Sequence, residues 1–314
     1  MVNFVEYQNE LHLINAAASA HPEDFVNHTE EAYHQSIRNI AEDILSQKKD
    51  CRLVMLSGPS SSGKTTTAHL LRNAFHKIGM GATIISLDDF YRGEQQAPLL
   101  PNGQHDYESI DALDVPDVER CLLSLINTSH CSMPVFDFSI HMPYPHKRQV
   151  TLGENDIAIV EGIHALNPAF ISKLPEKGVC KIYISVKQGI HEDQKELITA
   201  NGMRLVRRLV RDYNFRGTKP ERTLEMWPNV MDGERKYIKP YRIDADFTIN
   251  SFHAYETCVL AKQALALLEY VPSDCPDYTL AQRLRNSLGK FTIISSEFVP
   301  KDSIIREFIG GGIY

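Results

Sequence analysis

The apolar positions of this chain alternate between short continuous runs and longer stretches with helical spacing. Five short runs rich in β-branched residues predict buried strands, at residues 52–57, 82–87, 156–162, 181–186 and 245–250. Between them, apolar residues recur every three or four positions, as in amphipathic helices, at 68–78, 115–125, 259–268 and 280–288. Strands that alternate with helices predict an α/β fold, a three-layer structure around a parallel sheet.

The remaining segments add one strand and two terminal extensions. A run at 134–138 predicts another short strand, which leads into a proline-rich stretch at 142–145. Residues 1–50 look helical, with an apolar stripe that must pack on something; it comprises Tyr33, Ile37, Ile40 and Ile44. We therefore expect a helical extension at 1–50, a core domain at 51–251 and a second helical extension at 252–314.

The segment between the first strand and the first helix has the pattern G-x-x-x-x-G-K-T, at residues 58–65. Glycines let successive backbone N–H groups point inward, and the helix amino end adds partial positive charge, so such a loop binds phosphate. Lys64 can then reach the β- and γ-phosphates of a nucleoside triphosphate, and the Thr65 hydroxyl can bind Mg²⁺. The other loop residues predicted to bind the nucleotide are Gly58, Ser60, Ser61, Ser62, Gly63 and Thr66. The alternative is a glycine-rich turn that binds nothing, but the strand–loop–helix context favours a phosphate-loop (P-loop) NTPase of the nucleoside-kinase or nucleotide-kinase type.

Acidic residues follow two of the predicted strands. Asp88 and Asp89 come directly after the run at 82–87, and Glu161 ends the run at 156–162. Ligands gather at the carboxyl ends of parallel strands, where carboxylates can accept a proton or hold Mg²⁺ through water. The alternative for Asp88 and Asp89 is an ordinary helix cap or loop acid.

A predicted helix near 202–217 carries five arginines, at positions 204, 207, 208, 211 and 216. Guanidinium groups on one side of a helix suit a lid that closes over a triphosphate and neutralises developing charge. The alternative is a solvated helix face. The phosphate loop upstream favours the lid.

Composition narrows the class of protein further. The 314 residues are 43% hydrophobic and 23% charged, which is typical of globular proteins. A net charge of -7 argues against general binding to nucleic acid or anionic membranes. No stretch approaches eighteen apolar residues, and the amino terminus lacks a secretion pattern. Six scattered cysteines without a C-x-x-C pair indicate neither a zinc site nor a disulfide framework. We expect a cytoplasmic protein with reduced thiols.

Taken together, these motifs resemble the uridine kinase and phosphoribulokinase family of P-loop kinases, in particular a bacterial branch of uridine-kinase-like nucleoside kinases. The resemblance covers roughly residues 50–250. It rests on the phosphate loop, S-L-D-D-F-Y at 86–91, Y-E-S-I-D-A-L-D at 107–114, P-V-F-D-F at 134–138, E-G-I at 161–163 and the arginine stretch.

The resemblance implies roles for individual residues. In uridine kinases the acid matching Asp88 acts as base toward the 5′-hydroxyl, and the glutamate matching Glu161 supports Mg²⁺ together with Thr65. The positions matching Tyr91, Tyr107, Glu108, Phe136 and His141 form the acceptor site, and those matching Arg204, Arg207 and Arg211 form the lid. This chain departs from the family at Glu108, where aspartate is usual, and at Phe136, where tyrosine is usual. Losing a hydrogen-bond donor to the base changes the choice of substrate, so the base that is recognised stays open.

The sequence therefore predicts a kinase that uses ATP and Mg²⁺ and phosphorylates a small-molecule acceptor, most simply the 5′-hydroxyl of a nucleoside. Lys64, Asp88 and Arg211 are the predicted catalytic residues. Two alternatives remain: a kinase of another small sugar or sugar phosphate, as in phosphoribulokinase-like relatives, and a nucleotide-binding regulatory module without catalysis. The resemblance also makes a homo-oligomer possible.

Overall fold

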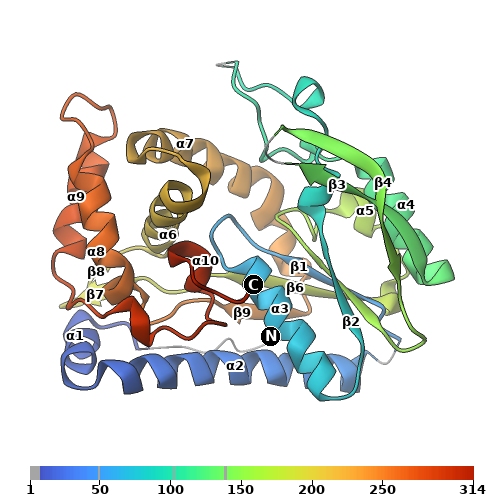
Figure 1. Cartoon of the computed structure of the whole chain (residues 1–314), viewed down its shortest axis with the longest axis horizontal. Coiled ribbons are helices and arrows are strands. Elements are labelled where there is room, and N and C mark those ends of the chain that lie inside the picture. Colours follow the sequence, from blue (N-terminus) through green and yellow to red (C-terminus); the bar gives the residue numbers. More distant parts are fainter. Residues whose placement is uncertain (1–7, 49, 102, 138–139) are drawn as a thin grey trace.

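The computed structural model describes residues 8–48, 50–101, 103–137 and 140–314. Within these residues, five strands form a parallel sheet in the order β2-β5-β1-β6-β9 (Figure 1). Their bounds are Leu53–Ser57 (β1), Ala82–Ser86 (β2), Ile157–Glu161 (β5), Val179–Ser185 (β6) and Phe247–Asn250 (β9). The predicted α/β fold with a parallel sheet is confirmed.

The strands are apolar on both faces because both faces are covered. Every residue of β1 is buried. Leu53 and Met55 face one apolar core, whereas Val54 and Leu56 face the other, because successive side chains of a strand point to opposite sides. The sheet therefore forms the middle of three layers.

Helices from both ends of the chain cover the face that receives Val54 and Leu56. They are α1 (Leu11–Ala20), α2 (Pro22–Gln47), α3 (Lys64–Lys77), α6 (Ala200–Arg216), α7 (Pro220–Gly233), α8 (Glu256–Glu269), α9 (Tyr278–Leu288) and α10 (Arg306–Ile309). The opposite face packs against α4 (Val115–Thr128) and α5 (Pro168–Ile171). None of the helices in the described ranges is both long and apolar enough to cross a membrane.

The predicted strand at 134–138 belongs to a hairpin rather than to a short isolated strand. β3 (His130–Asp137) pairs antiparallel with β4 (Met142–Thr151), and the two form a sheet of their own. Residue 138 lies outside the described residues. The sequence analysis missed β4 because of its prolines, but proline is tolerated on an edge strand, where no partner needs its missing N–H. A smaller hairpin joins β7 (Ile190–Glu192) to β8 (Lys195–Ile198).

The predicted extensions at both ends are part of the main core. The expected stripe of α2 is buried, with Tyr33 and Ile44 fully so. The Tyr33 hydroxyl lies 2.7 Å from the Thr67 hydroxyl of α3. From the carboxyl-terminal segment, residues 296–314, the Ser303 hydroxyl donates to Glu30 Oε1 of α2 at 2.6 Å. Both termini are therefore joined to the helix that follows the phosphate loop.

A fully buried ion pair connects two of the covering helices. Arg207 of α6 donates from Nε to Glu256 Oε2 of α8 at 2.7 Å, and both side chains are 0% exposed. Arg207 also donates to the carbonyl of Ser251. Removal of one partner leaves a buried charge without compensation, which is far costlier than loss of an exposed pair.

We predict that Glu256→Ala lowers the free energy of unfolding by about 3–5 kcal/mol, because it leaves the Arg207 guanidinium buried without its carboxylate. Chemical denaturation measures the change. The matched control is Glu225→Ala, which removes an exposed ion pair with Arg222 and should cost about 1 kcal/mol or less. Equal losses in the two variants would contradict the prediction.

Candidate active site

The phosphate loop lies at the carboxyl edge of the sheet, between β1 and α3. Gly58 permits a close approach to β6, since a β-carbon there would lie 2.1 Å from the carbonyl oxygen of Ile184. Gly63 precedes α3 with φ +86°, a conformation that favours glycine. The strand–loop–helix context predicted from the sequence is present, and the amino end of α3 points at the loop.

Lys64 lies at the centre of this edge. Its Nζ donates to the Pro59 carbonyl at 3.1 Å. Burial lowers the pKa of the Lys64 ammonium, whereas the carboxylates of Glu161, Glu307 and Asp88 act in the opposite direction. The predicted phosphate-binding lysine therefore lies among acids from three separate parts of the chain.

The two predicted strand-end acids come together because β2 and β5 are neighbours. Ser86 and Glu161 are paired in register, and the Ser86 hydroxyl donates to Glu161 Oε1 at 2.7 Å. Burial, with Asp88 as the next contribution, raises the pKa of Glu161 to about 7. Burial also raises the pKa of Asp88, which Lys64 opposes. Each carboxyl thus favours a proton or a cation nearby.

A cleft of about 740 Å³ opens over these residues. It is lined by Thr65, His69 and Arg72 of α3, by Ala82, Thr83, Ile84 and Ser86 of β2, by Asp88, Asp89 and Glu161, and by residues 148–151 of β4. Among the described residues no group of three or more His, Cys, Asp or Glu side chains could hold a metal by itself. Mg²⁺ commonly takes one or two carboxylates and completes its shell with water and substrate phosphates. The Thr65 hydroxyl and the Asp88 and Glu161 carboxylates fit that requirement.

Three of the predicted acceptor residues form an aromatic wall beside Asp88. The ring of Tyr91 lies edge-on to those of Tyr107 and Phe136, with centroids 6.0 and 5.9 Å apart. The Tyr91 hydroxyl donates to the carbonyl of Tyr107 at 3.2 Å. Because Phe136 belongs to β3, the hairpin supplies one side of this wall.

The adjacent acid Asp89 has a structural role, which differs from the role predicted for Asp88. Asp89 Oδ1 accepts from the Phe136 N–H at 3.4 Å, and Oδ2 lies 3.6 Å from Arg148 of β4. Asp89 therefore attaches the hairpin to the end of β2. Asp88 remains the acid that faces Lys64 and Glu161.

The last two predicted acceptor residues lie in contrasting places. Burial raises the pKa of Glu108 to about 7, while the positive charges of Arg208 and Lys64 oppose the shift. A β-carbon at Gly233 would lie 2.4 Å from Glu108 Cβ, so the end of α7 packs tightly against this acid. His141, in contrast, is exposed on the hairpin, where its carbonyl accepts from the Glu94 N–H at 3.3 Å.

Four of the five arginines of α6, at positions 204, 207, 208 and 211, are buried, so the alternative of a solvated helix face is wrong for them. Arg216, at the end of the helix, is exposed. Arg204 is 2% exposed and donates to the Ser60 carbonyl at 3.0 Å. Arg207 donates to the Ser61 carbonyl at 3.2 Å, and Arg208 to the Ser60 hydroxyl at 2.9 Å. These side chains support the phosphate loop from behind.

Arg211 acts on Asp88, the predicted base. Its Nε and Nη2 donate to Asp212 Oδ1 at 2.9 and 2.7 Å. Its positive charge, like that of Arg216, lowers the pKa of Asp88. The buried Asp212 also lies 3.2 Å from Arg208 Nε, so one acid orients several guanidinium groups.

Sequence reasoning missed the acids that hold these arginines. Asp212 follows Arg208 by four residues, a spacing that brings side chains together on a helix and could have indicated the pair. Glu234, which lies 2.7 Å from Arg204 Nη1, comes from a turn thirty residues away. Such a distant partner leaves no local signal.

We predict that Glu108→Gln stabilises the folded protein at alkaline pH. Burial raises the pKa of Glu108 from its ordinary 4.5 to about 7, so the stability that this proton contributes is complete below about pH 4.5 and is lost as the pH rises through 7. Glutamine stays neutral, so the variant should exceed the wild type at pH 8 by up to about 3 kcal/mol.

Denaturation across pH 4–8 measures this difference, which should shrink toward pH 4. The exposed Glu297→Gln on the carboxyl-terminal segment is the matched control and should show no such trend. A constant difference between Glu108→Gln and the wild type at every pH would contradict the prediction.

Comparison with known proteins fits this geometry. The model of the phosphoribulokinase/uridine kinase family matches residues 53–258. The chain is 28% identical over 179 residues to a uridine kinase of Mycoplasma genitalium, a match that covers 57% of this chain and 75% of that protein. It is 26% identical over 210 residues to a uridine kinase of Saccharomyces cerevisiae, covering 66% of this chain but only 38% of the yeast protein.

Among solved structures, a D-glycerate 3-kinase from Cryptococcus neoformans superposes with a TM-score of 0.47 at 17% identity, covering 67% of this chain and 89% of that one. The family match extends over more than half of the chain and includes the phosphate loop, Asp88 and Glu161. The chain is therefore a kinase that belongs to the phosphoribulokinase/uridine kinase family.

Proposed function

We propose that this kinase transfers the γ-phosphoryl group of ATP, with Mg²⁺, to the 5′-hydroxyl of a nucleoside. One observation carries the proposal: Asp88 is near both Lys64, whose charge lowers its pKa, and Tyr91, whose backbone N–H donates to the Asp88 carbonyl at 3.4 Å. Aromatic rings suit contact with a base or sugar ring, and the acid beside them suits a hydroxyl. The names of the relatives support the nucleoside as acceptor.

In this proposal the chain mainly positions the reactants and stabilises charge. The loop amides and Lys64 hold the triphosphate. Thr65 and Glu161 would hold Mg²⁺, which supplies positive charge to the phosphate oxygens when bound. Asp88 accepts the proton of the acceptor hydroxyl as the new O–P bond forms and the bond from the γ-phosphorus to the ADP oxygen breaks. Arg211 neutralises charge that develops on the transferred group.

The electrostatics of Asp88 suit a general base. Burial raises the pKa of this carboxyl, and the charges of Lys64, Arg216 and Arg211 oppose that shift by favouring the ionised form. A base is most effective when its pKa approaches the working pH while the ionised form still predominates. The opposing effects of burial and positive charge move Asp88 toward that balance.

A second candidate is a kinase of a small phosphorylated sugar. The cleft next to Asp88 is also lined by His69, Arg72 and Arg148, and guanidinium groups suit an acceptor that carries its own phosphate. Arg148 is only 3.6 Å from Asp89, however, so part of its charge is already compensated. We therefore prefer a nucleoside as the acceptor.

We predict that Asp88→Asn lowers kcat by about 10²–10⁴-fold, because the acceptor loses its base, while the Kd for Mg·ATP stays nearly constant. Steady-state ADP release and direct ATP binding measure the two quantities. Asp89→Asn is the matched control, since it changes the same charge one residue away on a side chain that holds the hairpin. Unchanged turnover in Asp88→Asn would remove this residue from the role of base.

The acceptor is tested by ADP release with Mg·ATP against nucleosides, sugar phosphates and small alcohols, with Lys64→Ala beside the wild type. Acceleration by nucleosides that is lost in Lys64→Ala supports the proposal. Acceleration by phosphorylated sugars alone would select the second candidate. ATP binding without acceleration by any acceptor would favour a nucleotide-binding module without catalysis.

A further inference from the structure

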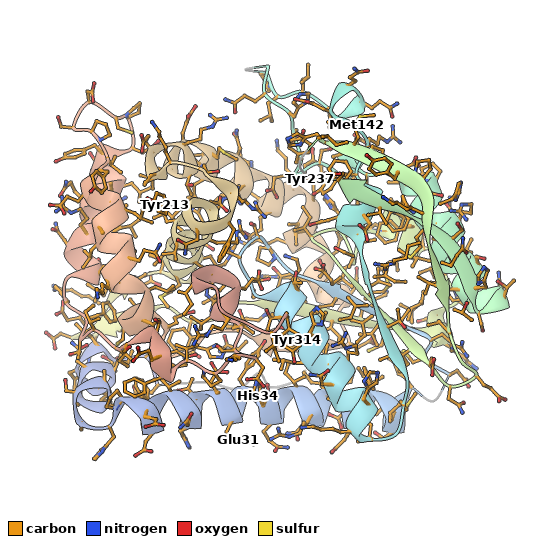
Figure 2. The ribbon with its side chains drawn as sticks, viewed as in Figure 1. Glu31, His34, Met142, Tyr213, Tyr237 and Tyr314 are labelled. Carbon is orange, nitrogen blue, oxygen red and sulfur yellow. The ribbon has the colours of Figure 1, made fainter. Side chains whose placement is uncertain are left out.

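The carboxyl-terminal segment lies against the phosphate loop, although it follows the region matched by the family by almost fifty residues. In Figure 1, α10 lies beside the start of α3. Ile304 is so close to the loop that a β-carbon at Gly63 would come within 3.1 Å of its Cδ1. The last residue, Tyr314, stacks on His69 of α3 with ring centroids 4.5 Å apart (Figure 2).

This segment is built into the fold. Ile304, Ile305 and Phe308 are fully buried. Arg306 ties the turn together by donating to the carbonyls of Ser296, Val299 and Gly310. A side chain carried here is therefore preorganised relative to the loop, which lowers the entropy cost of binding a ligand.

Glu307 is the polar side chain that this segment directs toward the loop. Its Oε2 accepts from the Thr66 hydroxyl at 3.4 Å. Its charge also acts on Lys64 and Glu161, raising the pKa of both groups. Glu307 itself is half-buried.

The order of residues in the loop indicates which part of a nucleotide Glu307 would meet. Lys64 serves the β- and γ-phosphates, and Thr65 serves Mg²⁺, so the γ end points toward Asp88 and Glu161. Thr66 follows these along α3, on the side of the α-phosphate and the nucleoside. A carboxylate repels phosphate oxygens, but it accepts hydrogen bonds from hydroxyls. An acid that binds the ribose hydroxyls is the arrangement by which dinucleotide-binding folds recognise their ligand.

We propose that Glu307 is a nucleotide-binding residue that recognises the ribose hydroxyls of the phosphate donor. This inference rests on the proposed function, because it requires a ribonucleoside triphosphate on the loop. It assigns to the carboxyl-terminal segment a direct part in selecting the donor. The selection concerns the sugar of the donor and is independent of the acceptor.

The test compares binding of Mg·ATP and Mg·2′,3′-dideoxy-ATP to the full chain without acceptor, by calorimetry. The wild type should bind ATP at least about tenfold more tightly, as expected for hydrogen bonds to a charged group. Glu307→Ala should bring the two Kd values to within about twofold of each other. The ratio isolates the sugar contact, because removal of a negative charge affects both triphosphates equally. Glu297→Ala, an exposed acid on the same segment, should keep the wild-type ratio.

Glu307→Gln is the second variant, should the alanine variant fail a thermal-unfolding check. Its amide oxygen still accepts a hydrogen bond but without charge, so an intermediate ratio of about threefold is expected. Equal affinities in the wild type, or a full ratio in Glu307→Ala, would overturn the inference and leave the proposed function intact. Tighter binding of both nucleotides by one factor in Glu307→Ala would identify a repulsive gate and overturn it too. Failure of the wild type to bind Mg·ATP would overturn the proposed function itself.

Discussion

The site depends on the way α6 holds the phosphate loop. A glycine-bounded loop has no strongly preferred conformation by itself, because glycine has the greatest conformational freedom to lose on folding. Here Arg204 and Arg207 donate to the carbonyls of Ser60 and Ser61. Each guanidinium is itself paired with a buried acid, Glu234 or Glu256. These contacts fix the loop from the side of α6, and we propose that the N–H groups of the loop bind phosphate. The buried charges thus specify a loop conformation, although such pairs add little net stability.

This arrangement divides the arginines of α6 between support and chemistry. Arg204, Arg207 and Arg208 face the loop, whereas Arg211 and Arg216 act on the charge of Asp88. Asp212 stands between the two groups and accepts from Arg211 while lying near Arg208. One helix therefore carries both groups. It is packed into the core because its apolar residues, among them Leu205 and Leu209, are buried there.

The sequence predicts those parts of the molecule whose signals are local. The strands, the phosphate loop and the acids at strand ends follow from apolar runs and from adjacent residues, and the structure brings Lys64, Asp88 and Glu161 together as the parallel sheet requires. The hairpin was recognised only in part, because proline obscures an edge strand. Glu234 and Glu256, which hold Arg204 and Arg207, and the position of Glu307 were not predictable, since their contacts link residues thirty to more than two hundred positions apart. Burial of the α6 arginines was missed for the same reason: their partners are distant.

The two halves of the site differ in how they are joined to the central sheet. The phosphate half is built on the central sheet and is enclosed by α3, α6 and the carboxyl-terminal segment. The acceptor half depends on the β3–β4 hairpin, which pairs only with itself within the described sheets and is attached to β2 through Asp89. The hairpin also contributes Cys131, Met133 and Val150 to the apolar core on its face of the sheet. We therefore propose that the central sheet positions the groups for phosphoryl transfer, whereas the hairpin, as a separate sheet, sets the choice of acceptor.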